Sequence, residues 1–205
     1  MTNALPTSGD FVVAEQSIER LIETATRINA PYWQTAGRFL SGKLMIERGE
    51  FAQGVIILND AFDACRLTGW RMSYPEFKGA LATGLAGLGQ LDEALTAVNE
   101  GLDDVVQAEH GHDLFFAELL RIKGEILLRR EAVTAAEDSF RQGINIARQQ
   151  EALLWELRAT LSLARLRADQ GHGSEARQLL SGVHARFTEG FETPDLLAAK
   201  QLLDE

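Results

Sequence analysis

The chain has 205 residues, 45% of them hydrophobic and 24% charged, a composition that is typical of a folded protein and excludes wholesale disorder. Its 30 acidic and 20 basic residues give a formal net charge of −10, so bulk electrostatics will not hold nucleic acid or an anionic membrane surface. The single cysteine, Cys65, excludes an intramolecular disulfide and a cysteine-rich zinc site.

Targeting and membrane segments are not indicated by the sequence. Residues 1–10 lack a basic stretch followed by an apolar one, as a signal peptide would have. No run approaches 18 consecutive apolar residues, which a membrane-spanning helix requires. We therefore expect a cytoplasmic protein.

Apolar residues recur at helical spacing along the whole chain, and no window shows the sustained alternation of a strand. In residues 91–106, for example, they follow an i, i+3, i+4, i+7 pattern. Pro31, Pro75 and Pro194 each stand where such a stretch begins, which suits the first turn of a helix. The predicted helices cover residues 10–29, 31–48, 50–67, 74–88, 91–108, 113–130, 133–150, 152–170, 174–187 and 194–203.

These helices form pairs, and small residues recur at matched offsets in each pair. Successive sets are separated by 40, 42 and 40 residues. The four sets are Gly42, Gly49, Phe51, Gly54, Leu58, Ala61; Ala82, Gly89, Leu91, Ala94, Val98, Gly101; Gly124, Glu131, Val133, Ala136, Phe140, Gly143; and Ala164, Gly171, Gly173, Ala176, Leu180, Val183.

This pattern resembles the tetratricopeptide repeat (TPR), in which small residues allow the two helices of a pair to cross closely. The period exceeds the usual length of about 34 residues, and the family's tryptophan is replaced by Arg38, Lys78, Leu120 and Thr160. The resemblance implies an all-α, right-handed superhelix of about four helix pairs with an extra helix at each end. We expect one helical-repeat domain over residues 1–205, with pairs at 31–68, 74–108, 113–150 and 152–187.

A second resemblance concerns the C-terminal repeat region of large bacterial regulators, where an ATPase domain follows a winged-helix or nucleotide-cyclase domain. It rests on the runs 115–125, 155–159 and 187–196, and it extends over about residues 10–205. It implies a regulatory or scaffolding role and carries no catalytic residue across.

The two end helices carry their own expectations. The first, residues 11–29, looks like the second helix of a pair whose first helix is missing, so its apolar face would be covered by self-association, as in a homodimer, or by a partner. The last, residues 194–203, would cap the apolar end of the array and present Asp195, Lys200 and Gln201 to water.

Several motifs that could suggest catalysis or metal binding have simpler explanations. Residues 37–44 resemble a phosphate-binding loop, but Leu44 stands where a magnesium-binding hydroxyl is needed and the segment is helical. Residues 110–113 offer two histidines and an aspartate, too few for a convincing metal site. Cys65 has no nearby base, and the acidic pairs, such as Asp103 and Asp104, fit solvated helix faces. We predict neither an enzyme nor a cofactor or metal.

The strongest candidate site is the concave groove that first helices line in the resembled family. Arginine and aromatic residues are frequent anchors of interfaces. The predicted groove residues of the partner-binding site are Lys43, Glu118, Arg121, Glu125, Arg129, Arg158 and Arg165, with Glu47, Glu76 and Asp169 beside them. The predicted rim aromatics are Phe39, Tyr74, Phe77, Phe116 and Trp155.

Two functions remain open from the sequence. The first is a non-catalytic interaction module that binds a peptide or protein, with Arg121, Arg158 and Arg165 contacting its acidic groups. The second is a sensor that binds a small molecule or signal peptide in a pocket ringed by Trp33, Tyr74 and Phe116. Alternatively, Glu118, Arg121, Glu125 and Arg158 pair with one another, because Glu118–Arg121 and Arg121–Glu125 have helical i+3 and i+4 spacing.

Overall fold

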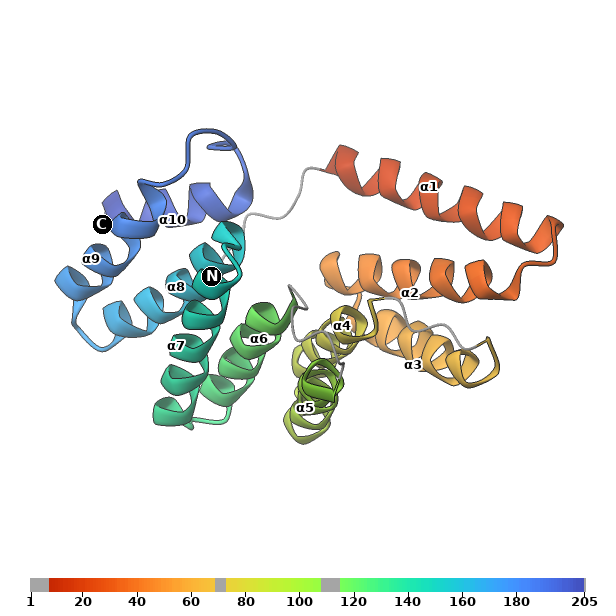
Figure 1. Ribbon diagram of the computed structural model, residues 1–205, viewed down its shortest axis with the longest axis horizontal. Helices are drawn as coiled ribbons and strands as arrows, with labels where there is room; N and C mark the ends of the chain where they lie inside the picture. Colours follow the sequence, from red (N-terminus) through yellow and green to blue (C-terminus); the bar gives the residue numbers. More distant parts are fainter. Residues whose placement is uncertain (1–7, 69–72, 108–114, 205) are drawn as a thin grey trace. The chain divides into compact units, whose positions relative to one another are not determined.

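The computed structural model describes residues 8–68, 73–107 and 115–204, and within these ranges it contains helices and no strand (Figure 1). The helices are α1 (Ser8–Arg27), α2 (Pro31–Glu47), α3 (Phe51–Thr68), α4 (Tyr74–Gly87), α5 (Leu91–Gln107), α6 (Phe115–Arg129), α7 (Val133–Gln149), α8 (Leu153–Asp169), α9 (Gly173–His184) and α10 (Pro194–Asp204).

The expected all-α repeat fold is confirmed, and each helix begins and ends within one turn of the position that the apolar period predicts. None of the helices in the described ranges is long and apolar enough to cross a membrane. The chain divides into two compact units, with the division between Gly101 and Leu102 inside α5. We call them the N-terminal unit and the C-terminal unit and describe each by itself.

Six helix ends share one stop signal. The residue after the C-cap adopts a left-handed backbone conformation at Asn29, Gly49, Gly89, Glu131, Glu151 and Gly171, with φ between 52° and 83°. The following N–H then bonds back to a carbonyl five residues earlier, as Glu50 N does to Met45 O at 2.9 Å and Ala132 N to Leu127 O at 3.0 Å. This is the Schellman arrangement, which satisfies the orphan carbonyls and reverses the chain.

In the N-terminal unit, glycines allow α2 and α3 to cross closely. A Cβ atom at Gly42 would lie 2.8 Å from Leu58 Cγ, and one at Gly54 would lie 2.9 Å from Gly42 O. Gly84 and Gly87 likewise allow α4 to pack closely on α3, because Val55 lies over Gly84 and the Phe51 ring lies over Gly87. The glycine-rich stretch of residues 84–89 is therefore a packing surface that ends in the stop signal at Gly89.

In the C-terminal unit, α6, α7, α8 and α9 lie in chain order beside one another (Figure 1). The fully buried Phe140 ring of α7 covers Gly124 of α6, which leaves no room for a Cβ atom there. Leu157, Leu180 and Leu196 belong to a core cluster that α8, α9 and α10 share. The expected role of α10 as a cap is consistent with this packing, because its Leu196 and Ala199 are buried.

Helix α1 packs against α2 and leaves other apolar side chains in solvent. Its Ile22 side chain fills the space over Gly37, and Arg48 ties the end of α2 back to Glu15 at 2.8 Å. Val13 and Ile28, on α1 and just beyond its end, are each 64% exposed.

Candidate functional site

In the C-terminal unit, the predicted groove residues lie on one face of two neighbouring helices. Glu118, Arg121, Glu125 and Arg129 follow each other at three- and four-residue spacing on α6, as Trp155, Arg158, Ser162 and Arg165 do on α8. Two contacts join the rows: Arg158 Nη1 lies 3.6 Å from Glu118 Oε1, and Ser162 Oγ donates a hydrogen bond to Glu125 Oε1 at 2.6 Å. We call this surface, formed by these two rows, the inner face of α6 and α8.

Glu118 and Arg121 form a two-pronged ion pair at the centre of the inner face. Arg121 Nε and Nη2 donate to the two carboxylate oxygens of Glu118 at 2.8 Å and 2.7 Å. The side chain of Glu118 is only 8% exposed. Such paired bonds between guanidinium and carboxylate fix both groups in one orientation.

The pKa of Arg121 is held above its ordinary value. Burial works to lower it, whereas the charge of Glu118 and the hydrogen bonds to Glu118 raise it, with further contributions from the charges of Glu125 and Asp195. The raising effects prevail, so Arg121 stays charged although it is largely covered. Its positive charge is therefore already committed to three carboxylates of its own unit.

Arg158 is bound by a residue that the sequence assigned to solvent. Its Nε and Nη2 both donate to Asp195 Oδ2 of α10, at 3.0 Å and 2.8 Å. The expectation that Asp195 faces water is wrong, because this carboxylate fastens the start of α10 to α8. The Arg158 guanidinium also lies 5.0 Å from the Trp155 ring centroid, within the range of a cation–π contact.

The last residues of the two rows, Arg129 on α6 and Arg165 on α8, are exposed to solvent. Arg165 forms no ion pair within the described part of the chain. Glu125 keeps 43% of its side chain exposed although it contacts Arg121 at 3.5 Å. The predicted pairing among Glu118, Arg121, Glu125 and Arg158 therefore occurs, while Arg165 remains available to a partner.

Lys43, the remaining predicted groove residue, belongs to the N-terminal unit. Its ammonium group binds Glu76 of α4 and lies 3.7 Å from Glu47 on its own helix. This ion pair joins α2 to α4 much as Arg158 and Glu118 join α8 to α6.

The predicted rim aromatics divide between surface and core. Phe39 and Phe77 are buried, with their rings stacked at 4.7 Å, so they are core residues and not rim residues. Tyr74 is half-buried beside Phe62, at a centroid distance of 5.0 Å. Phe116 and Trp155 are half-buried, as expected of groove residues, and Trp155 packs on Phe115.

Two charged residues, Glu156 and Lys78, are buried, which was not predicted from the sequence. Glu156 of α8 is 2% exposed, and it binds Arg148 at the end of α7 and Arg186 beyond α9. Lys78 of α4 lies 4.4 Å from the Phe62 ring centroid and binds Glu100. Both would have been recognisable only as polar residues at apolar helix positions.

The structure gives no support to the alternative sites. Within the described residues, no group of three or more histidine, cysteine, aspartate or glutamate side chains could hold a metal ion. Residues 110–113 lie outside the described residues. The loop-like motif at residues 37–44 is part of α2, and Cys65 is buried.

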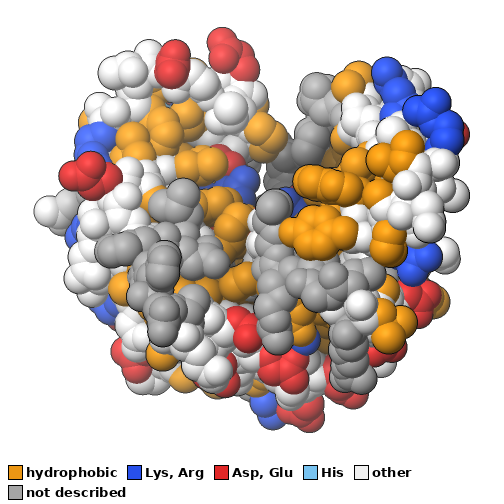
Figure 2. Space-filling view, turned by 45° about the vertical axis from the view of Figure 1, so that its right-hand side comes forward, with side chains coloured by type: hydrophobic (Ala, Val, Ile, Leu, Met, Phe, Trp, Pro, Cys, Tyr) orange, Lys and Arg blue, Asp and Glu red, His pale blue; other side chains and the backbone are white. Residues whose placement is uncertain are grey.

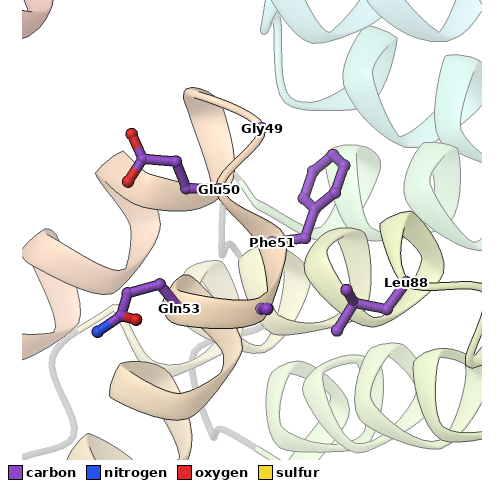
Figure 3. Close-up of a pocket in the computed structure, with 6 residues that line it drawn as sticks. Gly49, Glu50, Phe51, Gln53 and Leu88 are labelled. Atoms are coloured by element: carbon purple, nitrogen blue, oxygen red, sulfur yellow. The ribbon is translucent and has the colours of Figure 1, made fainter.

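The N-terminal unit has a shallow hollow on its surface. It is lined by Gly49, Glu50, Phe51, Ala52, Gln53 and Leu88. Figure 3 shows Phe51 and Leu88 on one side of it, whereas Glu50 and Gln53 point away from them. None of the three aromatic residues that the sensor hypothesis requires is among its lining residues, so this hollow does not favour that hypothesis.

Comparisons with known proteins support the fold. No protein-family model matches the sequence, and no curated protein matches it. Two solved structures show the nearly identical TPR-like repeats assigned to a kinesin light chain of Podosopora anserina, one of them in a single-residue variant. They superpose with TM-scores of 0.63 and 0.61 at 18% identity, and each match covers 84% of both chains. The chain therefore has a TPR-like helical-repeat fold.

Proposed function

We propose that the chain is a non-catalytic interaction module whose inner face of α6 and α8 binds a protein or peptide. The observation that carries this proposal is the alignment of charged and aromatic side chains on that face, held in place by ion pairs and left open at Arg165. The ion pairs already fix these side chains before a partner binds. Binding would therefore cost little conformational entropy of this surface.

The chemistry of the face indicates which contacts a partner makes. Arg121 and Arg158 are already paired with Glu118 and Asp195, so their main role is to hold the face in a fixed conformation. Arg165 offers its charge to an acidic group, and Trp155 offers a flat apolar surface beside Arg158. Arginine and tryptophan are the side chains that most often dominate binding energy.

A regulatory role and a cytoplasmic location are part of this proposal. The regulatory role rests on the sequence resemblance to the repeat regions of bacterial regulators, and the location rests on the sequence patterning described above. A homodimer through α1 is also part of it, since Val12 and Val13 on α1 and Ile28 just beyond its end are exposed apolar residues.

Site-specific cross-linking tests the binding face. The chain carries a photo-reactive residue in place of Arg165 on α8, or in place of exposed Gln178 on α9, and is irradiated in a lysate of its source. We expect the same protein to be cross-linked repeatedly from position 165 and not from position 178. Equal yields from both positions would contradict a binding site on the inner face.

Charge reversal gives a second, quantitative readout. Arg165→Glu should reduce capture of that protein about tenfold, since it turns an attraction into a repulsion. Arg177→Glu makes the same change at an exposed position of α9 and should leave capture unchanged. Loss of capture in both variants would indicate a general effect of net charge and not a site.

A further inference from the structure

A second surface, in the N-terminal unit, exposes large apolar side chains beside charged ones. Trp33, Leu40, Lys43 and Glu47 follow one face of α2, because steps of seven, three and four residues return to the same side of a helix. Trp33 is 48% exposed and Leu40 is 38% exposed. Figure 2 shows hydrophobic side chains gathered on the part of the surface that α1 and α2 form.

Helix α4 continues this surface with small side chains. The ion pair between Lys43 and Glu76 brings the charged end of the α2 row against α4. Beyond Glu76, the same face of α4 carries Ala80 and Thr83 at the next helical steps. Thr83 is exposed and its hydroxyl donates to Gly79 O at 2.9 Å, so no long side chain rises from α4 here. A chain lying on α4 could approach its backbone closely.

The charges of this surface are unbalanced. Lys43 is shared between Glu47, at 3.7 Å, and Glu76. One ammonium faces two carboxylates, which leaves an excess negative charge next to the apolar patch of Trp33 and Leu40. Glu47 is almost half exposed and can accept a further donor from outside.

We propose that this surface, made of the α2 row and the small face of α4, binds a peptide segment with a large apolar side chain and a neighbouring lysine or arginine. The apolar side chain packs on Trp33 and Leu40, and the basic group binds Glu47 and Glu76. This inference rests on the proposed function as an interaction module and adds a second surface with a partner chemistry of its own.

The charges of this surface favour a basic, apolar peptide over an acidic segment or a second copy of the chain. An acidic segment would be repelled by the excess carboxylate. A second copy that used the same surface would place Glu47 and Glu76 near like charges, and no basic cluster lies in the described α2 row to offset them. A peptide with both apolar and basic groups satisfies each part of the surface.

Two synthetic peptides of equal length test this chemistry by nuclear magnetic resonance. One contains leucine and lysine, and the other has glutamate in place of every lysine. The indole N–H signal of Trp33, identified by its loss in Trp33→Phe, reports binding. We expect the lysine peptide to shift this signal and the amide signals of residues 40–47 and 76–83 in a saturable way, and the glutamate peptide to leave them in place.

Matched variants locate the effect on the surface. Leu40→Ser should weaken binding of the lysine peptide at least about fivefold, whereas Ile56→Ser, at a 56% exposed position of α3, should not. Glu47→Gln should also weaken it, whereas Glu93→Gln in α5 should not. Thr83→Lys, which needs no change in the core, should weaken it by adding a charge and a long side chain to α4.

Three results would overturn the inference. They are equal binding of the two peptides, equal effects of Leu40→Ser and Ile56→Ser, and a Trp33 signal that shifts with protein concentration alone, which would indicate a second copy as the occupant. If the lysine peptide fails while the Arg165 experiments succeed, this inference falls and the proposed function stands. If the peptide binds while Arg165→Glu has no effect, this surface stands as a binding site and the binding site on the inner face of α6 and α8 falls.

Discussion

Glu131 occupies a backbone conformation that is unfavourable for its side chain. Its φ is 61°, in the left-handed region, where a residue with a Cβ atom loses roughly 1–2 kcal/mol relative to glycine. Gly49, Gly89 and Gly171 stand at the matching place in the other repeats. We expect Glu131→Gly to raise the free energy of unfolding by about 1 kcal/mol in urea denaturation.

The matched control for this position is Glu131→Ala. It removes the same carboxylate but keeps the Cβ atom, so it should not stabilise the protein. If both variants stabilised it equally, the effect would come from the lost charge and the conformational explanation would be wrong.

Single residues also mark the limit of prediction from sequence. Glu118 and Arg121 are three residues apart on one helix, so their pairing follows from helical spacing alone. Asp195 and Arg158 are separated by 37 residues, and Glu156 binds Arg148 and Arg186 from two other segments. These partners become neighbours only after the helices pack, and periodicity carries no information about them.

At the scale of elements, the crossing of α6 and α7 depends on Gly124. A Cβ atom there would collide with the Phe140 ring, so Gly124→Ala should destabilise the protein by about 1–3 kcal/mol in thermal or urea unfolding. Replacing Phe140 with leucine in the same chain should recover part of this loss. An unchanged stability of Gly124→Ala would show that the ring moves aside without cost.

Gly182 in α9 provides the opposite control. A Cβ atom at this position would meet no other atom within 4 Å. Gly182→Ala should therefore stabilise the protein by about 0.5–1 kcal/mol, because alanine loses less backbone entropy in a helix. The two substitutions are chemically identical, so opposite signs would isolate the effect of packing.

The attachment of α1 to α2 should depend on pH. The hydrogen bond from Arg48 is the largest influence on the pKa of Glu15 and lowers it, burial raises it, and the charge of Arg48 lowers it further, so the pKa lies below the ordinary value of a glutamate. The contribution of this pair is thus complete above about pH 4.5 and is lost as the pH falls through the lowered value. We expect amide hydrogen exchange in α1 to accelerate over that acid range.

Two variants test the assignment of this effect to Glu15. Glu15→Gln should make exchange in α1 faster at neutral pH and less dependent on acid. Glu19→Gln, at an exposed position one turn further along α1, should behave like the unmodified chain. Acid dependence that persists in Glu15→Gln would assign it to another group.

The helices themselves were predictable because the apolar period follows their course and local signals mark several of their ends. Apolar residues keep the 3.6-residue period, prolines open α2, α4 and α10, and a left-handed residue closes six helices. The sequence also identified the rows on α6 and α8. It misassigned Phe39 and Phe77, because a phenylalanine at a groove position and one at a core position look alike until the neighbouring helix is placed.

At the scale of the whole molecule, the proposed homodimer predicts a concentration-dependent mass. Exposed Val12, Val13 and Ile28 would be buried between two copies of α1. Val13→Glu should weaken self-association about tenfold in sedimentation equilibrium, since it places a charge in an apolar contact. Ile56→Glu should have no effect. A wild-type chain that stays monomeric at every concentration tested would exclude this part of the proposal.

The carboxylate of Glu156 has an implication for the evolution of this chain. Arg148 at the end of α7 and Arg186 beyond α9 both bind it, so three separate positions form two ion pairs that share one carboxylate. Losing both arginines would strand a buried charge, and losing the glutamate would leave two cations facing each other. In an alignment of homologous sequences, these three positions should therefore covary as a triplet, with the polar set retained or replaced together.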